Sequence, residues 1–175
     1  RGYAITTDLL GNVYIAGTVG GHVDFDGDGI TDFPDLDWYY SYVQKLDSSG
    51  NSLWVNALND GSVDAQSITT DIAGNVYITG GFDDTVDFDK DGVIDFTSAG
   101  SGDAYVQKLD SDGNYLWGAS MGGTDGDSGA SITTDKDGNV YSMGSYRGSA
   151  DFDDNGVNDL IANSVSNIFI HKMDS

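Results

Sequence analysis

Short runs of Val, Ile, Tyr and Leu are separated along this chain by clusters of Asp, Gly and Asn. In the middle of the chain such runs predict four strands, near residues 66–71, 75–80, 104–110 and 114–120. The first two and the last two are each joined by a segment spelled Asp-x-x-Gly-Asn. Asp accepts backbone N–H groups and Gly or Asn can take a positive φ, so both segments predict tight hairpin turns. The pattern therefore predicts a four-stranded antiparallel meander.

The same pattern recurs, which indicates an internal repeat. Ile5, Ile68 and Ile132 each open an Ile-Thr-Thr-Asp segment, and they lie 63 and 64 residues apart. Later blocks keep one order: Gly-Asn-Val-Tyr at Gly11, Gly74 and Gly138, then Asp-Phe-Asp at Asp24, Asp87 and Asp151, then a third strand at Tyr42, Tyr105 and Phe169. A final Leu-Trp block occurs only at Leu53 and Leu116. Three units are therefore expected, and the last one lacks its fourth strand.

Units with Val, Ile, Tyr and Trp on both faces cannot bury themselves alone and must stack on neighbours. Radial stacking of four-stranded meanders gives a β-propeller. A linear β-solenoid is the competing architecture, although its repeats are usually shorter. The expected fold is all-β, with tandem propeller blades near residues 3–60, 66–122 and 130–175, the last blade truncated.

Composition supports strands and turns and narrows the function. All 29 acidic residues are Asp, which prefers turns, and there are 25 Gly and one Pro. The net charge of −22 argues against nucleic-acid and anionic-membrane partners, and no long apolar run predicts membrane insertion. The chain has no Cys and therefore no thiolate site. A simply solvated acidic surface remains the alternative explanation of the charge.

An aspartate-rich insertion follows the second strand of each unit and fits Asp-x-Asp-x-[Asp/Asn]-Gly-x-x-Asp in all three. The candidate calcium ligands are at loop positions one, three, five, seven and nine. They are Asp24, Asp26, Asp28, Ile30 and Asp32; Asp87, Asp89, Asp91, Val93 and Asp95; and Asp151, Asp153, Asn155, Val157 and Asp159.

This spacing suits calcium, which takes about six to eight oxygen ligands in loose geometry. Side chains at positions one, three and five converge as the chain wraps the ion, and Gly at position six permits the sharp turn. Position seven contributes its backbone carbonyl, and Asp at position nine closes the site. About three ions are expected, with the weakest site in the third loop because Asn155 replaces a carboxylate. Magnesium fits less well because it demands a stricter octahedron.

Several blocks together resemble the bacterial SBBP-type β-propeller repeat: Ile-x-x-Asp-x-x-Gly-Asn-Val-Tyr, then Asp-Phe, then Tyr-Val-x-Lys-Leu-Asp-x-x-Gly-Asn-x-Leu-Trp. The loop alone resembles the calcium loop of integrin-type FG-GAP blades, since an EF-hand would need flanking helices. The SBBP resemblance implies a secreted or cell-surface bacterial propeller and supplies no catalytic residue. The aspartate-rich insertion departs from that repeat.

Signals for catalysis are weak, so the chain is not expected to be an enzyme. Of two His, His171 occupies a strand position held by Gln in the other units, and His22 lies in a variable loop. No nucleophile elbow, phosphate loop or zinc spacing is present. Phe25, Phe88 and Phe152 lie inside the loops and are expected to anchor them. The run beginning at Trp38 is either packing or a contact for a sugar or protein.

Two functions remain open. The first is a calcium-stabilised structural or adhesive module of a bacterial surface or filament. The second is a glycan- or ligand-binding propeller, or part of a larger propeller enzyme. The missing fourth strand suggests either a piece of a longer propeller or chains that assemble with one another. Sites of this kind suit millimolar external calcium, which favours an extracellular location.

Overall fold

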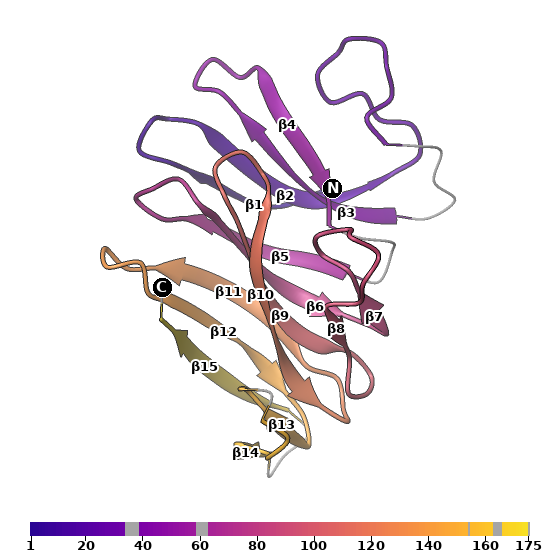
Figure 1. Cartoon of the computed structure of the whole chain (residues 1–175), viewed down its shortest axis with the longest axis vertical. Coiled ribbons are helices and arrows are strands. Elements are labelled where there is room, and N and C mark those ends of the chain that lie inside the picture. The colour runs from indigo at the N-terminus through magenta and orange to yellow at the C-terminus, as the bar shows by residue number, and fades with distance from the viewer. Residues whose placement is uncertain (34–38, 59–62, 154, 163–165, 175) are drawn as a thin grey trace.

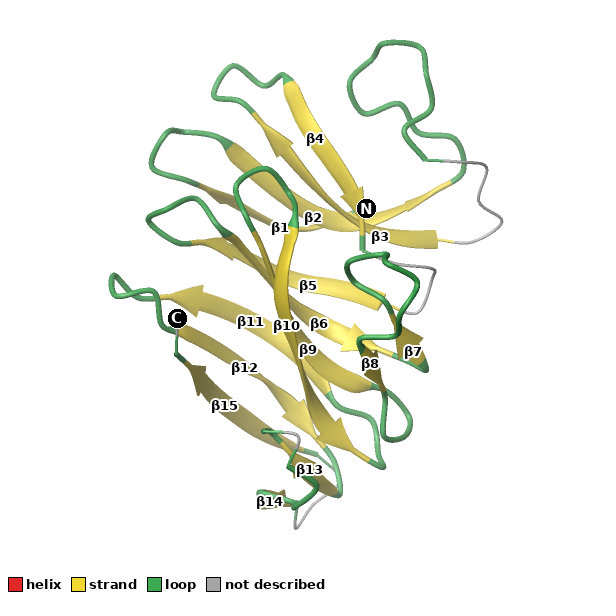
Figure 2. Cartoon of the chain, viewed as in Figure 1, coloured by secondary structure: helices red, strands yellow, loops and turns green. Residues whose placement is uncertain are grey.

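The computed structural model describes residues 1–33, 39–58, 63–153, 155–162 and 166–174. All regular elements within these ranges are β-strands in antiparallel sheets, which confirms the all-β prediction (Figures 1 and 2). No helix of this described part is long and apolar enough to cross a membrane. The main sheets follow one another in chain order along the long axis, which is vertical in Figure 1.

Two four-stranded meanders form the first and second sheets. The first has the order β1 (Gly2–Thr7), β2 (Val13–Gly20), β3 (Tyr39–Leu46) and β4 (Ser52–Ala57). The second has the order β5 (Val63–Thr70), β6 (Val76–Phe82), β9 (Asp103–Leu109) and β10 (Tyr115–Gly123). The four strands predicted for the middle of the chain are thus confirmed, and β10 runs further than predicted.

The third sheet and two short hairpins complete the described structure. The third sheet has the order β11 (Ser128–Thr134), β12 (Val140–Tyr146) and β15 (Asn167–Met173). The hairpins are β7 (Thr85–Val86) with β8 (Phe96–Thr97), and β13 (Ser149–Asp151) with β14 (Leu160–Ile161). Strand β13 also pairs with the end of β10, so the β13–β14 hairpin extends the second sheet. The division into three blades stays a prediction.

Each sheet is apolar on both faces, and neighbouring sheets pack face to face. We call face A the face that carries Tyr14, Ala16 and Val43 in the first sheet, with the equivalent residues in the other sheets, and face B the opposite face. Face A of the first sheet packs on face B of the second, and face A of the second packs on face B of the third. Face B contributes Val76, Ile78 and Tyr105 in the second sheet and Ile132, Val140 and Phe169 in the third. The core therefore lies between sheets.

The first strands of the three sheets lie next to one another, because β5 packs against both β1 and β11. Thr70 donates its hydroxyl proton to the backbone carbonyl of Thr7 at 3.2 Å, and Thr134 donates in the same way to Thr70 at 3.1 Å. Equivalent residues one repeat apart thus form a ladder that sets the register between sheets.

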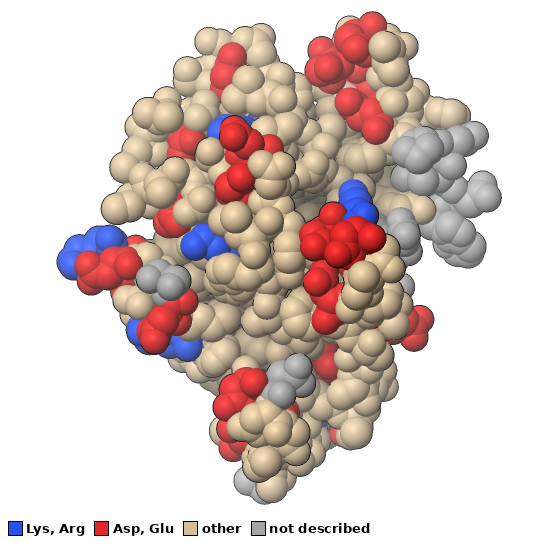
Figure 3. All heavy atoms as spheres, in the orientation of Figure 1, with Lys and Arg blue, Asp and Glu red and all other residues tan. Residues whose placement is uncertain are grey.

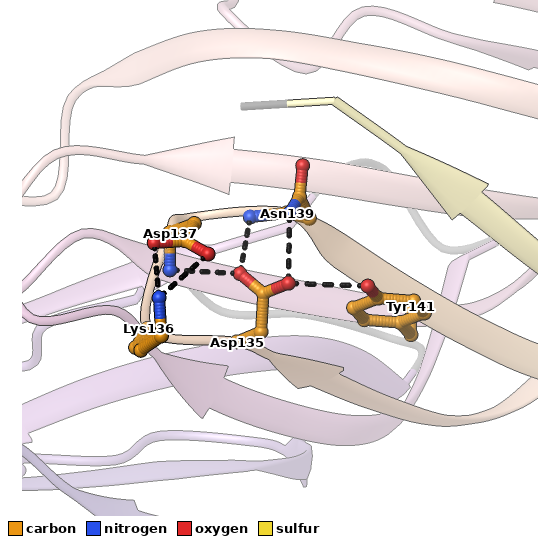
Figure 4. A network of polar contacts seen from close by, with 5 residues as sticks. All are labelled: Asp135, Lys136, Asp137, Asn139 and Tyr141. Atoms are coloured by element: carbon orange, nitrogen blue, oxygen red, sulfur yellow. Dashed lines mark hydrogen bonds and ion pairs between the residues drawn. The ribbon is translucent and has the colours of Figure 1, made fainter.

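Turns spelled Asp-x-x-Gly-Asn share one hydrogen-bond network, shown for Asp135 in Figure 4. One carboxylate oxygen of Asp135 accepts the backbone N–H of Asp137 at 2.9 Å and of Asn139 at 3.0 Å. The other oxygen accepts the Asn139 side-chain amide at 2.7 Å and the Tyr141 hydroxyl at 3.1 Å. Gly138 supplies the left-handed backbone with a φ of +86°. The same carboxylate-to-backbone bonds at Asp71 and Asp110 confirm the two predicted turns.

Replacing the aspartate that organises such a turn is expected to destabilise the protein. In Asp110→Ala, the N–H groups of Asp112 and Asn114 lose their carboxylate acceptor. We expect the free energy of unfolding in urea to fall by about 1–2 kcal/mol. Asp112→Ala removes the same charge from an exposed position of the same turn, and we expect a change within about 0.5 kcal/mol. Equal losses in the two variants would contradict this role of the turn.

The same network makes part of the stability depend on pH. Hydrogen bonding, first of all from the Asn139 side chain, lowers the pKa of Asp135 to about 2. A carboxyl group with a lowered pKa stabilises the fold above its unfolded pKa, and this stabilisation is lost as pH falls through the folded pKa. The stability difference between wild type and Asp135→Ala should therefore shrink from about pH 4 to about pH 2. Urea unfolding at successive pH values measures it, and a difference that grows on acidification would disprove the assignment.

Candidate metal centres

Each aspartate-rich loop lies in the hairpin between the second and third strands of its repeat. The N–H at loop position nine closes the hairpin by donating to the carbonyl of the residue before position one. These bonds run from Asp32 to Val23, from Asp95 to Val86 and from Asp159 to Ala150, each at 2.9 Å. Positions one and nine are therefore held near each other by the backbone, before any ion is considered.

Three aspartates meet in every loop, at positions one, three and nine. In each group, one carboxylate oxygen per residue lies within 4.8 Å of the others. The groups are Asp24, Asp26 and Asp32; Asp87, Asp89 and Asp95; and Asp151, Asp153 and Asp159. Oxygens this close can share one cation, because calcium–oxygen distances are about 2.3–2.6 Å. Figure 3 shows that acidic side chains gather in separate patches on the visible face.

One hydrogen-bond network holds all three loops. In the second loop, Asp87 at position one accepts the N–H of Gly92 at 2.8 Å, and Asp95 accepts the N–H of Phe88 at 2.7 Å. Gly92 has a φ of +89°, the conformation for which Gly is suited at this turn. The equivalent bonds join Asp24 to Gly29, Asp32 to Phe25, Asp151 to Gly156 and Asp159 to Phe152. The sequence pattern therefore corresponds to one repeated local structure.

The side chains at position five do not belong to the groups of three aspartates. Asp28 and Asp91 are outside the groups of three, and in each an oxygen accepts the N–H of position seven at 2.7 Å. Asn155 makes the same bond to Val157 at 2.8 Å. Position five thus shapes the turn that presents position seven. Ligation by the position-five side chains and by the carbonyls of Ile30, Val93 and Val157 stays a prediction.

Charge crowding gives the carboxylates at positions one and three of the first loop opposite pKa shifts. The N–H of Gly29 does most to hold the pKa of Asp24 below its ordinary value. At Asp26, the bond from the N–H of Asp28 lowers the pKa, but desolvation, the Asp28 charge and contact with Asp24 outweigh it. The pKa of Asp26 is therefore raised, and that of Asp89 is raised by the same combination in the second loop. Carboxylates in such mutual repulsion are stabilised by a nearby cation.

One atom of the second loop fits a bound cation directly. Oδ1 of Asp87 is buried and has no hydrogen-bond partner within the described part of the chain. A buried carboxylate oxygen without a donor is costly unless a positive charge lies nearby. The residues present therefore fit a divalent cation held by oxygen ligands, and no thiolate or imidazole belongs to any of the three groups.

The phenylalanine at position two fastens each loop to its sheet. Its ring packs on an aromatic residue of the third strand. The ring centroids are 4.8 Å apart for Phe25 and Tyr42, 5.1 Å for Phe88 and Tyr105, and 5.0 Å for Phe152 and Phe169. The prediction that these Phe residues anchor the loops is confirmed.

Other candidate residues lie away from the loops or gain no new role. His171 is a half-buried residue of β15 with Nδ1 3.1 Å from the sulfur of Met121, and burial lowers its pKa. His22 lies in the loop after β2, and Trp38 lies outside the described residues. Asp127 was not predicted: it is buried and accepts N–H groups from Gly123 and Arg147, each at 2.8 Å. No repeated sequence motif includes Asp127, because its environment depends on contact between segments that are distant in the sequence.

Comparison of the chain with models of known protein families gives no match, and comparison with curated proteins also gives none. The local geometry of the three loops therefore carries the functional interpretation.

Removing an anchoring ring should loosen both the sheet and the loop. Phe88 is 5% exposed and also packs against Phe96 and Tyr115. Phe88→Ala is expected to lower the free energy of unfolding by about 3–5 kcal/mol. Phe25 is less buried, so Phe25→Ala should cost less. Urea unfolding of both variants measures the difference, and equal small effects would show that the rings do not anchor their loops.

Proposed function

We propose that this chain is a calcium-binding β-propeller repeat module with a structural or adhesive role at a bacterial surface or in a filament. One observation carries the proposal: the same three carboxylates, held by the same hydrogen bonds, recur in three loops. A single acidic turn arises easily on a chain this acidic. Three copies with one internal geometry are better explained by a common ligand.

Calcium is the cation that the donor set favours. All side-chain ligands in the three groups are carboxylates. The side chains at position five and the backbone carbonyls at position seven would add further oxygens. Calcium accepts many oxygen ligands at variable angles, whereas magnesium retains waters and a strict octahedron. Three Ca²⁺ would contribute +6 against the net charge of −22, leaving −16.

The proposed role of the ion is to join a long hairpin to the body of its blade. The loop has few apolar residues of its own, and its Phe already packs on the third strand. A cation on the carboxylates would remove their repulsion and fix the remainder of the loop. At free calcium about ten times the dissociation constant, each occupied site would add about 1.4 kcal/mol to stability.

Two features support propeller blades as the architecture. Each meander packs face to face on the next, and the first strands lie side by side along the threonine ladder. In a propeller, the first strands of successive blades line a common axis. We further propose an extracellular, non-catalytic module, since loops of this kind operate at millimolar calcium. Any further partner would be a protein or glycan contacted by the blades.

Calcium titration of the chelated protein tests the proposal. We expect binding of about three ions by isothermal titration calorimetry and a higher melting temperature in calcium than in chelator. Asp95→Asn removes one carboxylate of the second loop, so it should reduce the bound calcium by one ion and diminish the thermal shift.

Asp112→Asn is the matched control, because it makes the same charge change at an exposed residue outside the loops. It should bind as the wild type does, and magnesium at the same concentration should give a smaller thermal shift. Identical melting in calcium and in chelator would count decisively against the proposal, as would equal calcium binding by the two variants.

A further inference from the structure

The third sheet exposes a face that is buried in the other two sheets. On its face A, Ile168 and Ile170 are 79% and 76% exposed. The residues at the same repeat positions are at most 3% exposed: Ser41 and Val43 in the first sheet, and Ala104 and Val106 in the second. Met143, at the position of the fully buried Ala16 and Thr79, is also exposed. This face carries larger apolar side chains than its buried equivalents and no polar replacement for them.

The first sheet exposes the complementary face. Ile5 on face B is 69% exposed, whereas its equivalents Ile68 and Ile132 are 6% and 5% exposed beneath the preceding sheet. One chain thus presents at its two ends the two halves of an interface that it forms twice internally.

We propose that face A of the third sheet docks on face B of the first sheet of a second copy of this chain. The second copy is favoured because it continues the established packing: the internal sheets already associate A on B, with the repeat units in the same order. Repeat faces that stay in solvent are usually polar, whereas the residues named here on these two faces are apolar.

Polar contacts across the internal interface have counterparts at the ends. Lys45 donates to the carbonyl of Ser111 in the next repeat at 2.8 Å. By repeat position, Lys172 corresponds to Lys45 and Ser48 corresponds to Ser111. Docking would therefore bring Lys172 to the Ser48 carbonyl of the second copy, exchanging its present exposed contact with Asp174 for that bond.

The threonine ladder can extend in the same direction. Each rung runs from the hydroxyl of one repeat to the backbone carbonyl of the repeat before it, from Thr70 to Thr7 and from Thr134 to Thr70. Thr7 of a second copy would donate to the Thr134 carbonyl. A head-to-tail interface of this type is heterologous, so it closes into a ring or grows into an open filament.

This inference rests on the module role proposed above but not on its calcium sites, because none of the face residues belongs to an aspartate-rich loop. The mutual repulsion of chains carrying −22 each opposes association. Added sodium chloride screens that repulsion, so association should strengthen as ionic strength rises.

Sedimentation velocity over a wide range of protein concentration tests the interface, in calcium and in chelator. We expect the wild type to associate with increasing concentration, into either one closed oligomer or a growing series. Ile170→Asp on face A and Ile5→Asp on face B should each weaken association by at least about thirtyfold. Leu116→Asp is the control, because Leu116 is half exposed on the middle sheet, between the two terminal faces.

Mixing the two face variants gives the sharpest result. Ile5→Asp retains face A and Ile170→Asp retains face B, so the mixture should form a dimer while each variant alone remains monomeric. Circular dichroism must show that both are folded. A monomeric wild type at every concentration overturns the proposal and leaves these faces to a different occupant. Equal association of both face variants and the Leu116→Asp control also overturns it. Association without measurable calcium binding would refute the calcium sites alone.

Discussion

The structure depends on one constraint: a four-stranded sheet that is apolar on both faces must be covered on both sides. In the described part of the chain, the sheets cover one another at the two internal contacts, together with residues of the hairpins. Val43, Val106, Ile68 and Ile132 are all buried at such contacts. Stability is therefore shared between repeats, as in other arrays whose units contact mainly their neighbours.

The long hairpins meet a different difficulty, because they project beyond the sheets and have little apolar surface to bury. They are held by short-range contacts: one ring packed on the third strand, and carboxylates that accept backbone N–H groups inside the loop. The hairpin of the third repeat also pairs with β10 of the second. A cation in each loop would complete this local reinforcement without requiring more core.

Short sequence motifs predicted the local structure well. Turns such as Asp71 to Asn75 depend on residues at most six positions apart, so strands, turns and the groups of three aspartates follow from the sequence directly. The pairing of β13 with β10 and the burial of Asp127 did not follow, because both depend on segments from different repeats meeting in space. The orientation of Asp28 and Asp91 toward the backbone was also missed. Spacing alone does not tell whether an aspartate faces an ion or caps a turn.

Aspartate has two opposite electrostatic roles in this chain. In the Asp-x-x-Gly-Asn turns, desolvation raises the pKa of the carboxylate, but bonds from several N–H donors outweigh it, so the pKa is lowered. A tyrosine hydroxyl adds to these donors at Asp71 and Asp135. In the loops, Asp26 and Asp89 face other carboxylates, and their pKa values are raised. The excess of Asp therefore has two explanations in this chain: turn aspartates that accept backbone N–H groups, and loop aspartates that could share a positive ion.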